Sequence, residues 1–244
     1  MSNNIIDCQH NNEGLSSIYN DECRERRRQK MADKWKVQFI TNNACGYSHI
    51  EGARLALEGG CKWIQLRMKD CEDEEIETTA LIIKELCHTY GAIFIIDDKV
   101  EIALKTKADG VHLGKNDMSP LEAREMLGED FIIGGTANTI NDIRHLTIQG
   151  VDYIGCGPYR FTSTKKNLSP IIGAEGYGNI IRSMRDEGMT TAMVAIGGIK
   201  GNDIKLLRDK GIEGIAVSGA VLDSDDPADD MRMMIREIQN EDNI

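Results

Sequence analysis

The sequence predicts a single (β/α)₈ barrel preceded by a polar amino-terminal extension. Eight short apolar runs rich in valine and isoleucine alternate with segments whose apolar residues recur at three- and four-residue spacing. The 244 residues suffice for one large barrel. Alternating strands and helices favour parallel strands joined by right-handed crossovers, and eight such units favour closure. An open doubly wound sheet is the alternative, but no G-x-G-x-x-G motif follows the first expected strand.

The expected strands are four to six residues long. They span residues 37–41, 63–66, 93–97, 110–113, 131–136, 153–157, 193–197 and 214–218. The segments between them end at glycine or a polar turn, as helices do. Ser119-Pro120-Leu121-Glu122 and Thr139-Ile140-Asn141-Asp142 supply helix-start chemistry of the capping-box kind. The barrel is therefore expected over residues 35–244.

Residues 1–34 form the expected extension, which contains the basic run Arg24 to Lys30. We expect a solvated extension or a short helix here, with an electrostatic tether as the functional alternative. Asp109, Asp152 and Glu213 each stand at or just before a strand start. Because barrels use the amino-terminal ends of their strands for stability rather than chemistry, we interpret these acids as structural.

Composition restricts the function. A net charge of −11 argues against nucleic acid or an anionic membrane as the main partner, so any phosphate site must be a local basic patch. There is no run of 18 apolar residues and no apolar amino-terminal segment of secretory type. The seven cysteines are scattered and include no C-x-x-C pair, which is typical of reduced thiols. A cytoplasmic protein is expected.

Charged residues collect after the expected strands, where the reacting face of a barrel lies. Arg67 and Lys69 stand two apart after the second strand, so extended backbone would point both cations to one side, as a polyanion requires. The loop after the sixth strand adds Thr162, Ser163, Thr164, Lys165 and Lys166. Gly198, Ser218 and Gly219 follow the last two strands, where backbone N–H groups close on phosphate in this architecture. Two anion sites are thus predicted.

Asp97 and Asp98 end the third expected strand side by side. Two carboxylates roughly 5 Å apart repel by about 3 kcal/mol at an effective dielectric of 20, unless a cation neutralises them. Asp98 could share Mg²⁺ with Asp117, which follows the fourth strand, while substrate phosphates complete the metal shell. Because successive strand side chains face opposite ways, Asp97 and Asp98 need not enter one site.

Other candidates are weaker. His112 alternates with apolar residues, which is more typical of a hydrogen-bonded barrel histidine than of a general base. Cys156, within a strand, is typical of a small buried hydrophobe. No Cys–His or Ser–His nucleophile pair is evident.

Seven segments together resemble the thiamine-phosphate synthase family. They occur in order between residues 37 and about 222 and read QLRMK (65–69), DD (97–98), GVHLGKND (110–117), GGTANT (134–139), GCGPYRFTSTKK (155–166), AIGGI (195–199) and GIAVSGAV (214–221). The resemblance implies a barrel enzyme that joins 4-amino-5-hydroxymethyl-2-methylpyrimidine diphosphate to a thiazole phosphate, forming thiamine monophosphate and pyrophosphate.

The resemblance also implies residue roles. The pyrimidine diphosphate would be held by Gln65, Leu66, Arg67, Met68, Lys69, Asp97, Thr136 and Lys165, of which Arg67, Lys69 and Lys165 would be catalytic. The thiazole phosphate would be held by Thr162, Ser163, Thr164, Gly198, Ser218 and Gly219. Asp98 and Asp117 would bind Mg²⁺. A homodimer is a further family-level expectation.

The chain departs from the family pattern at three site positions. Asp97 stands where the family usually has Asn, so this carboxylate must bind metal, donate as a protonated acid or face away. Thr136 replaces a usual Ser and keeps the hydroxyl, whereas Gly219 replaces a usual Ser and leaves only backbone contact. A thiazole tautomerase-like protein, a phosphate-binding module without synthase activity, and a phosphosugar isomerase or epimerase are the rival hypotheses.

Overall fold

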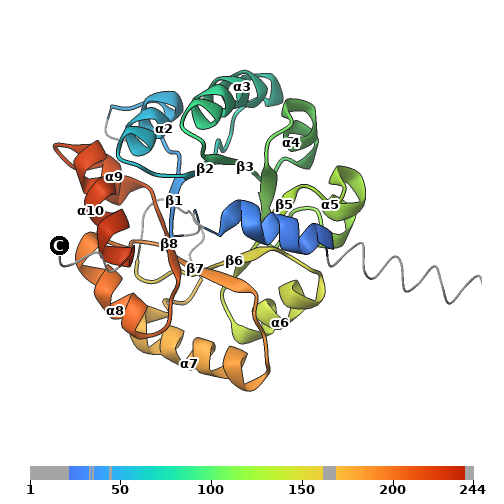
Figure 1. Cartoon of the computed structure of the whole chain (residues 1–244), viewed down its shortest axis with the longest axis vertical. Helices are drawn as coiled ribbons and strands as arrows, with labels where there is room; N and C mark the ends of the chain where they lie inside the picture. The colour runs from blue at the N-terminus through green and yellow to red at the C-terminus, as the bar shows by residue number, and fades with distance from the viewer. Residues whose placement is uncertain (1–21, 33, 35, 44–45, 162–168, 240–244) are drawn as a thin grey trace, which may run out of the picture.

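Eight parallel strands close into a barrel in simple chain order, each neighbour hydrogen-bonded to the next and β8 to β1 (Figure 1). The computed structural model describes residues 22–32, 34, 36–43, 46–161 and 169–239. The strands are β1 (Val37–Ile40), β2 (Trp63–Leu66), β3 (Ile93–Asp97), β4 (Gly110–Leu113), β5 (Ile132–Ala137), β6 (Tyr153–Cys156), β7 (Ala192–Ile196) and β8 (Gly214–Val217). The predicted (β/α)₈ barrel is confirmed.

Helices surround the strands as an outer ring (Figure 1). They are α2 (His49–Glu58), α3 (Asp73–Thr89), α4 (Val100–Thr106), α5 (Pro120–Leu127), α6 (Ile140–Ile148), α7 (Gly173–Asp186), α8 (Ile204–Asp209), α9 (Gly219–Leu222) and α10 (Pro227–Gln239), with a 3₁₀ turn, η1 (Gly201–Asp203). Both predicted capping boxes are present, at Ser119 with Glu122 and at Thr139 with Asp142. A third box pairs Ser48 with Glu51 at the start of α2.

Two apolar layers explain why the strands read as continuous hydrophobic runs. Strand residues that point outward, such as Phe94 and Ile154, join the large core between barrel and helices. Alternate residues point inward, where Trp63, Ile95 and Tyr153 belong to a separate interior cluster. Because parallel strands are buried on both faces, both sets must be apolar.

A helix over residues 22–31 crosses the amino-terminal end of the barrel (Figure 1, blue). Met31 at its end is fully buried and belongs to the interior cluster with Trp63 and Tyr153. Within the basic run, Arg27 is also buried. Part of the predicted extension is thus a helix that packs on the barrel. Arg27 and Met31 hold it there, because both side chains are buried at the amino-terminal end of the strands.

The acids at the strand starts supply some of those partners. Asp152 accepts from the Ile133 backbone N–H over 2.9 Å and also pairs with Arg27. Asp109 accepts from the Phe94 N–H over 2.8 Å and pairs with Lys30 over 2.5 Å. The structural interpretation is confirmed for these two, whereas Glu213 is exposed.

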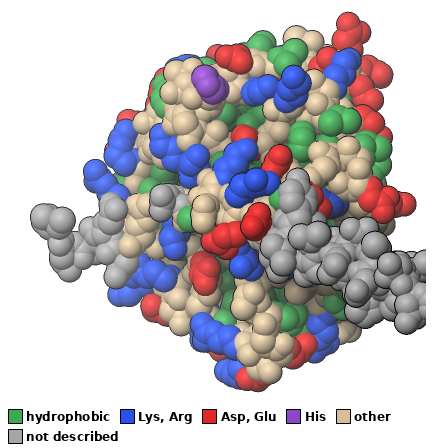
Figure 2. Space-filling view, turned by 45° about the vertical axis from the view of Figure 1, so that its right-hand side comes forward, with side chains coloured by type: hydrophobic (Ala, Val, Ile, Leu, Met, Phe, Trp, Pro, Cys, Tyr) green, Lys and Arg blue, Asp and Glu red, His purple; other side chains and the backbone are tan. Residues whose placement is uncertain are grey.

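The described surface is strongly charged but mixed. Figure 2 shows acidic and basic side chains interspersed over one face, with apolar patches between them. Within the described ranges, no helix combines the length and apolar character that crossing a membrane requires.

Candidate active site

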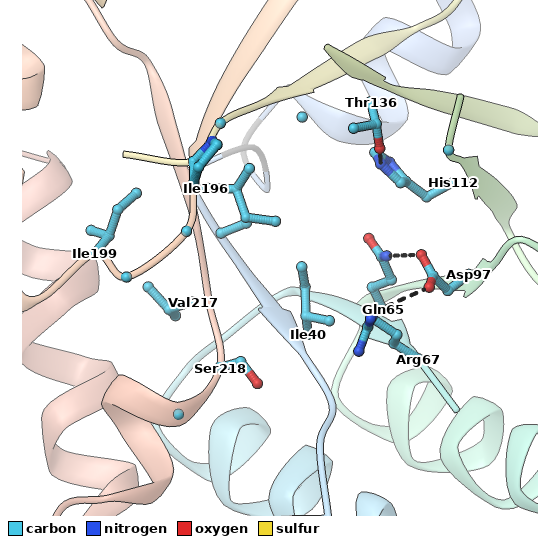
Figure 3. A pocket seen from close by; sticks show the side chains of 18 of the residues that line it. Ile40, Gln65, Arg67, Asp97, His112, Thr136, Ile196, Ile199, Val217 and Ser218 are labelled. Carbon is cyan, nitrogen blue, oxygen red and sulfur yellow. Dashed lines mark hydrogen bonds and ion pairs between the residues drawn. The ribbon is translucent and has the colours of Figure 1, made fainter. Parts of the chain in front are cut away.

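A cavity of about 790 Å³ opens at the carboxyl ends of the strands (Figure 3). Every strand end, or the loop after it, contributes to its wall. Its chemically informative residues are Gln65, Arg67, Lys69, Asp97, Asp98, His112, Asp117, Thr136, Gly198, Ser218 and Gly219. This is where the sequence predicts the reacting face.

One side of the cavity carries a compact group of charges. The Asp97 Oδ2 lies 3.2 Å from the Lys69 Nζ and 3.5 Å from the Arg67 Nε. Lys69 also forms an ion pair with Asp98. Asp97 is largely buried, with a side chain 9% exposed, whereas the side chains of Arg67 and Lys69 are 24% and 43% exposed. The two cations are therefore held at the cavity wall and remain accessible to an anion.

The adjacent aspartates both enter the cavity. Asp97, the last residue of β3, pairs in register with His112 and points inward (Figure 3). Asp98 leaves the strand with a left-handed backbone, φ 63°. In a regular strand the Asp98 side chain would point to the face opposite that of Asp97. The left-handed backbone breaks this alternation, and both carboxylates form ion pairs with Lys69. Their mutual repulsion is offset here by a lysine and an arginine.

Asp117 lies on the neighbouring part of the wall, in the loop after β4. Its Oδ2 accepts from the Gly114 backbone N–H over 2.7 Å, which fixes the loop. In the described part of the chain, no cluster of three or more His, Cys, Asp or Glu side chains could hold a metal. Asp98 and Asp117 nevertheless both line this cavity, and two carboxylates fit Mg²⁺, which binds through one or two carboxylates and fills its remaining positions with water and substrate phosphate.

Gln65 links this charged group to the barrel interior. Its Nε2 donates to the Asp97 Oδ1 over 2.6 Å (Figure 3). Its Oε1 is buried and has no hydrogen-bond partner among the described residues. A buried acceptor without a partner costs about 1–3 kcal/mol, so this atom is a candidate contact for a ligand donor.

His112 is hydrogen-bonded on both ring nitrogens, as expected from the sequence. Its Nδ1 lies 3.0 Å from the Tyr153 Oη, and its Nε2 lies 3.0 Å from the Thr136 Oγ1. Burial raises the pKa of Tyr153, so the phenol stays protonated. The glycine at position 134 leaves space for this arrangement, since a Cβ there would lie 2.2 Å from the Tyr153 Cζ. The chain of polar groups positions the Thr136 hydroxyl in the cavity wall.

The opposite side of the cavity combines a glycine turn with apolar residues. Gly198 has φ 71°, and a Cβ there would lie 2.5 Å from the Arg160 Cγ, so a side chain is excluded on both grounds. The Ser218 Oγ is buried and lacks a hydrogen-bond partner among the described residues. Ile199 and Val217 line the same side (Figure 3).

A small network behind the wall supports Arg67. The Thr41 Oγ1 accepts from the Arg67 backbone N–H over 3.1 Å and lies 2.8 Å from the His49 Nδ1. Burial lowers the pKa of His49, Glu75 opposes the shift, and the Arg67 charge adds to it. His49 and Thr41 thus support the strand end that carries the guanidinium.

The structure brings together ten of the predicted site residues on this one cavity: Gln65, Arg67, Lys69, Asp97, Asp98, Asp117, Thr136, Gly198, Ser218 and Gly219. Leu66 is buried in the core between barrel and helices, and Met68 packs against that core, so neither side chain lines the cavity. Thr162, Ser163, Thr164 and Lys165 lie outside the described residues.

Lys115, Asn138 and Lys200 are among the polar residues of the wall that sequence reasoning did not single out. Asn138 donates from Nδ2 to the Gly157 carbonyl over 2.5 Å, and Lys115 pairs with Asp142 over 2.7 Å. All three lie within the first few residues after a strand, and this position is the sequence feature that could have identified them.

Comparison with known sequences identifies close relatives. A sequence model of the thiamine monophosphate synthase family matches residues 37–221. The thiamine-phosphate synthase of Bacteroides fragilis is 54% identical over 199 residues, which cover 82% of this chain and 98% of the relative. That of Flavobacterium psychrophilum is 45% identical over 79% of this chain and 93% of its own length.

Solved structures agree. Thiamine phosphate pyrophosphorylase from Pyrococcus furiosus superposes with a TM-score of 0.76 at 30% identity, covering 86% of this chain and 98% of that one. The corresponding enzyme from Bacteroides thetaiotaomicron has a TM-score of 0.61 at 15% identity, covering 86% of this chain and 100% of that one, and so supports the fold alone.

Proposed function

Because this chain belongs to the thiamine monophosphate synthase family, we propose that its cavity joins the pyrimidine diphosphate to the thiazole phosphate with release of pyrophosphate. The chain is an enzyme, a thiamine-phosphate synthase and hence a transferase acting on small molecules. The observation that carries the site assignment is the meeting of Arg67, Lys69, Asp98 and Asp117 on one cavity.

The diphosphate end of the pyrimidine substrate belongs beside Arg67 and Lys69. These cations are already oriented by Asp97 and Asp98, so they need little rearrangement to contact an anion. Thr136 supplies a hydroxyl from the adjoining wall. Lys165, outside the described residues, is proposed as a further cation, with Leu66 and Met68 contributing through backbone alone.

Asp98 and Asp117 are the proposed Mg²⁺ ligands. When bound, the ion would supply positive charge to the phosphate oxygens. In this structure Asp98 forms an ion pair with Lys69. A bound metal would therefore share the Asp98 carboxylate with Lys69 or displace the lysine from it. A freed Lys69 ammonium would then face the diphosphate.

The thiazole phosphate belongs on the opposite side. The Ser218 Oγ, with backbone N–H groups at Gly198 and Gly219, suits its phosphate, and Ile199 and Val217 suit the ring. Thr162, Ser163 and Thr164 are proposed to add hydroxyls to the same phosphate.

The chemistry follows from where charge develops. The bond between the pyrimidine methylene carbon and the diphosphate oxygen breaks, and its electron pair leaves with pyrophosphate. Arg67 and Lys69 stabilise the growing negative charge. The thiazole nitrogen then donates its lone pair to the methylene carbon, so no protein nucleophile is needed. Cys156, the last residue of β6, is buried, and burial raises the pKa of its thiol to about 12, which makes it a poor nucleophile.

An assay tests the proposal. The purified chain is incubated with pyrimidine diphosphate, thiazole phosphate and Mg²⁺, and release of pyrophosphate and formation of thiamine phosphate are followed. We expect both products in equal amounts, with neither formed when Mg²⁺ is chelated. Absence of thiamine phosphate at substrate concentrations that saturate binding would contradict the assignment.

The rival hypotheses are not favoured. A tautomerase-like or non-catalytic phosphate-binding barrel would not account for relatives named as synthases at 54% and 53% identity. A cytoplasmic location and a homo-oligomer stay predictions from the sequence.

A further inference from the structure

The side-chain amide of Gln65 has one orientation in this structure. Its Nε2 lies 2.6 Å from the Asp97 Oδ1, and its Oε1 is buried without a partner in the described part of the chain. Figure 3 shows the amide between Asp97 and the centre of the cavity, with Ile40 on one side. Both residues are held by the barrel itself, Gln65 in β2 and Asp97 at the end of β3.

Asp97 determines that orientation. An ionised carboxylate accepts hydrogen bonds and donates none, so it binds the NH₂ end of an amide and rejects the carbonyl end. Its other oxygen, Oδ2, lies 3.5 Å from the Arg67 Nε and 3.2 Å from the Lys69 Nζ, so both oxygens of this carboxylate face N–H donors. Turning the Gln65 amide over would place two acceptors 2.6 Å apart, so the reversed orientation is strongly disfavoured.

The cavity is therefore presented with an acceptor and not a donor. The unpartnered Oε1 requires an N–H or O–H group from whatever binds there, because a buried acceptor that stays unpaired is destabilising. With an amide side chain at position 97 this selectivity would disappear, because two amides can satisfy each other in either orientation.

We propose that Asp97 is a positioning residue that makes the cavity select a substrate carrying a hydrogen-bond donor opposite Gln65. Resting on the proposed function, this donor is the amino group of the pyrimidine ring. Asp97 acts through Gln65 and through the two cations, and does not itself contact the diphosphate, whose charge it would repel. This gives the carboxylate a role that is compatible with its position in a phosphate-binding cavity.

The test compares binding of two ligands, so that the electronic effect of the ring substituent on the reaction does not enter. Dissociation constants are measured by calorimetry, with thiazole phosphate omitted, for the 4-amino pyrimidine diphosphate and for an analogue with an oxo group in its place. We expect the wild type to prefer the amino compound by roughly 100-fold, since with the oxo compound the buried Oε1 would face a second acceptor and form no hydrogen bond.

Asp97→Asn should reduce that preference at least tenfold, mainly by improving binding of the oxo compound. Gln65→Met, which removes the amide altogether, should also reduce the preference for the amino compound. This second variant keeps the inference testable if Asp97→Asn does not fold. Asp73→Asn is the matched control, because it removes a carboxylate from an exposed ion pair with Lys99 and should leave the preference unchanged.

The outcomes separate two failures. If the wild type binds both compounds but Asp97→Asn keeps the same preference within twofold, the positioning role of Asp97 is wrong while the substrate assignment stands. If the wild type binds neither compound, the assignment of the pyrimidine diphosphate to this cavity is wrong, and the inference falls with it.

Discussion

Arg27 donates from its Nε to the Asp152 Oδ1 over 2.8 Å, with side chains only 5% and 3% exposed. Arg124 approaches the other Asp152 oxygen to 3.0 Å. The amino-terminal helix is thus attached to the barrel by a buried charge network beneath β5 and β6, at the end opposite the cavity.

Arg27→Ala should destabilise the fold without changing the chemistry. Removing one partner of a buried ion pair costs about 3–5 kcal/mol, and we expect the lower value because Asp152 keeps Arg124. Urea unfolding measures the change, and kcat at a temperature well below the midpoint should remain that of the wild type. Arg28→Ala, at the exposed neighbouring position, should alter stability by less than about 0.5 kcal/mol. Equal losses in the two variants would contradict a specific role for Arg27.

Asp98→Asn and Asp117→Asn should each reduce turnover by roughly 100-fold, about 2.7 kcal/mol in activation free energy, because each removes a proposed Mg²⁺ ligand. The amount of Mg²⁺ needed for half-maximal activity should rise in both variants, and the melting temperature should change little. Steady-state rates across a Mg²⁺ titration provide the measurement.

Asp70→Asn is a matched control for Asp98, because Asp70 also has a left-handed backbone, φ 60°, but does not line the cavity. It should retain wild-type Mg²⁺ dependence. An unchanged Mg²⁺ response in the Asp98 variant would rule out that residue as a ligand.

Ser218→Ala should have opposite effects on stability and binding. It removes a buried hydroxyl that lacks a partner among the described residues, so the free protein should be as stable as the wild type or slightly more so. Loss of its hydrogen bond to the phosphate should raise KM for the thiazole phosphate about tenfold.

Ser48→Ala should show the reverse pattern. It breaks the capping box of α2, so the melting temperature should fall by an amount equivalent to about 1 kcal/mol, with KM unchanged. If Ser218→Ala behaved like Ser48→Ala, the hydroxyl would be structural.

We expect the folded protein to lose stability in mild acid because of His49. Burial lowers the folded-state pKa of its imidazole below the ordinary histidine value of about 6.5, so the unfolded chain binds the proton more readily than the folded one. Its contribution is fully present above pH 6.5 and is lost as the pH falls below that value toward the folded-state pKa. Thermal unfolding at pH 7.5 and 5.5 should show a larger drop for the wild type than for His49→Gln. His88→Gln, at an exposed position of α3, should follow the wild type.

The hydrophobic pattern was sufficient to predict every strand to within one residue at each end. Residues that point inward and residues that point outward are both apolar, so each strand is a continuous apolar run in the sequence. The site was predictable where chemistry follows a strand directly, as with Arg67, Lys69 and Asp117. The direction of Asp98 was not, because a left-handed residue at a strand end breaks the alternation on which the expectation depended. The ion pair of Arg27 could not be predicted from the local sequence pattern either, because its partner Asp152 is 125 residues away.

The left-handed conformation of Asp98 has a consequence for engineering this enzyme. A non-glycine residue at φ 63° is disfavoured by about 1–2 kcal/mol relative to a glycine, which adopts that region freely. Selection for folding alone would therefore accept Asp98→Gly, although the carboxylate that brings Lys69 and the proposed metal together would be lost. Stability and turnover make opposing demands at this position, so a screen for heat resistance would retain a substitution that a screen for activity would discard.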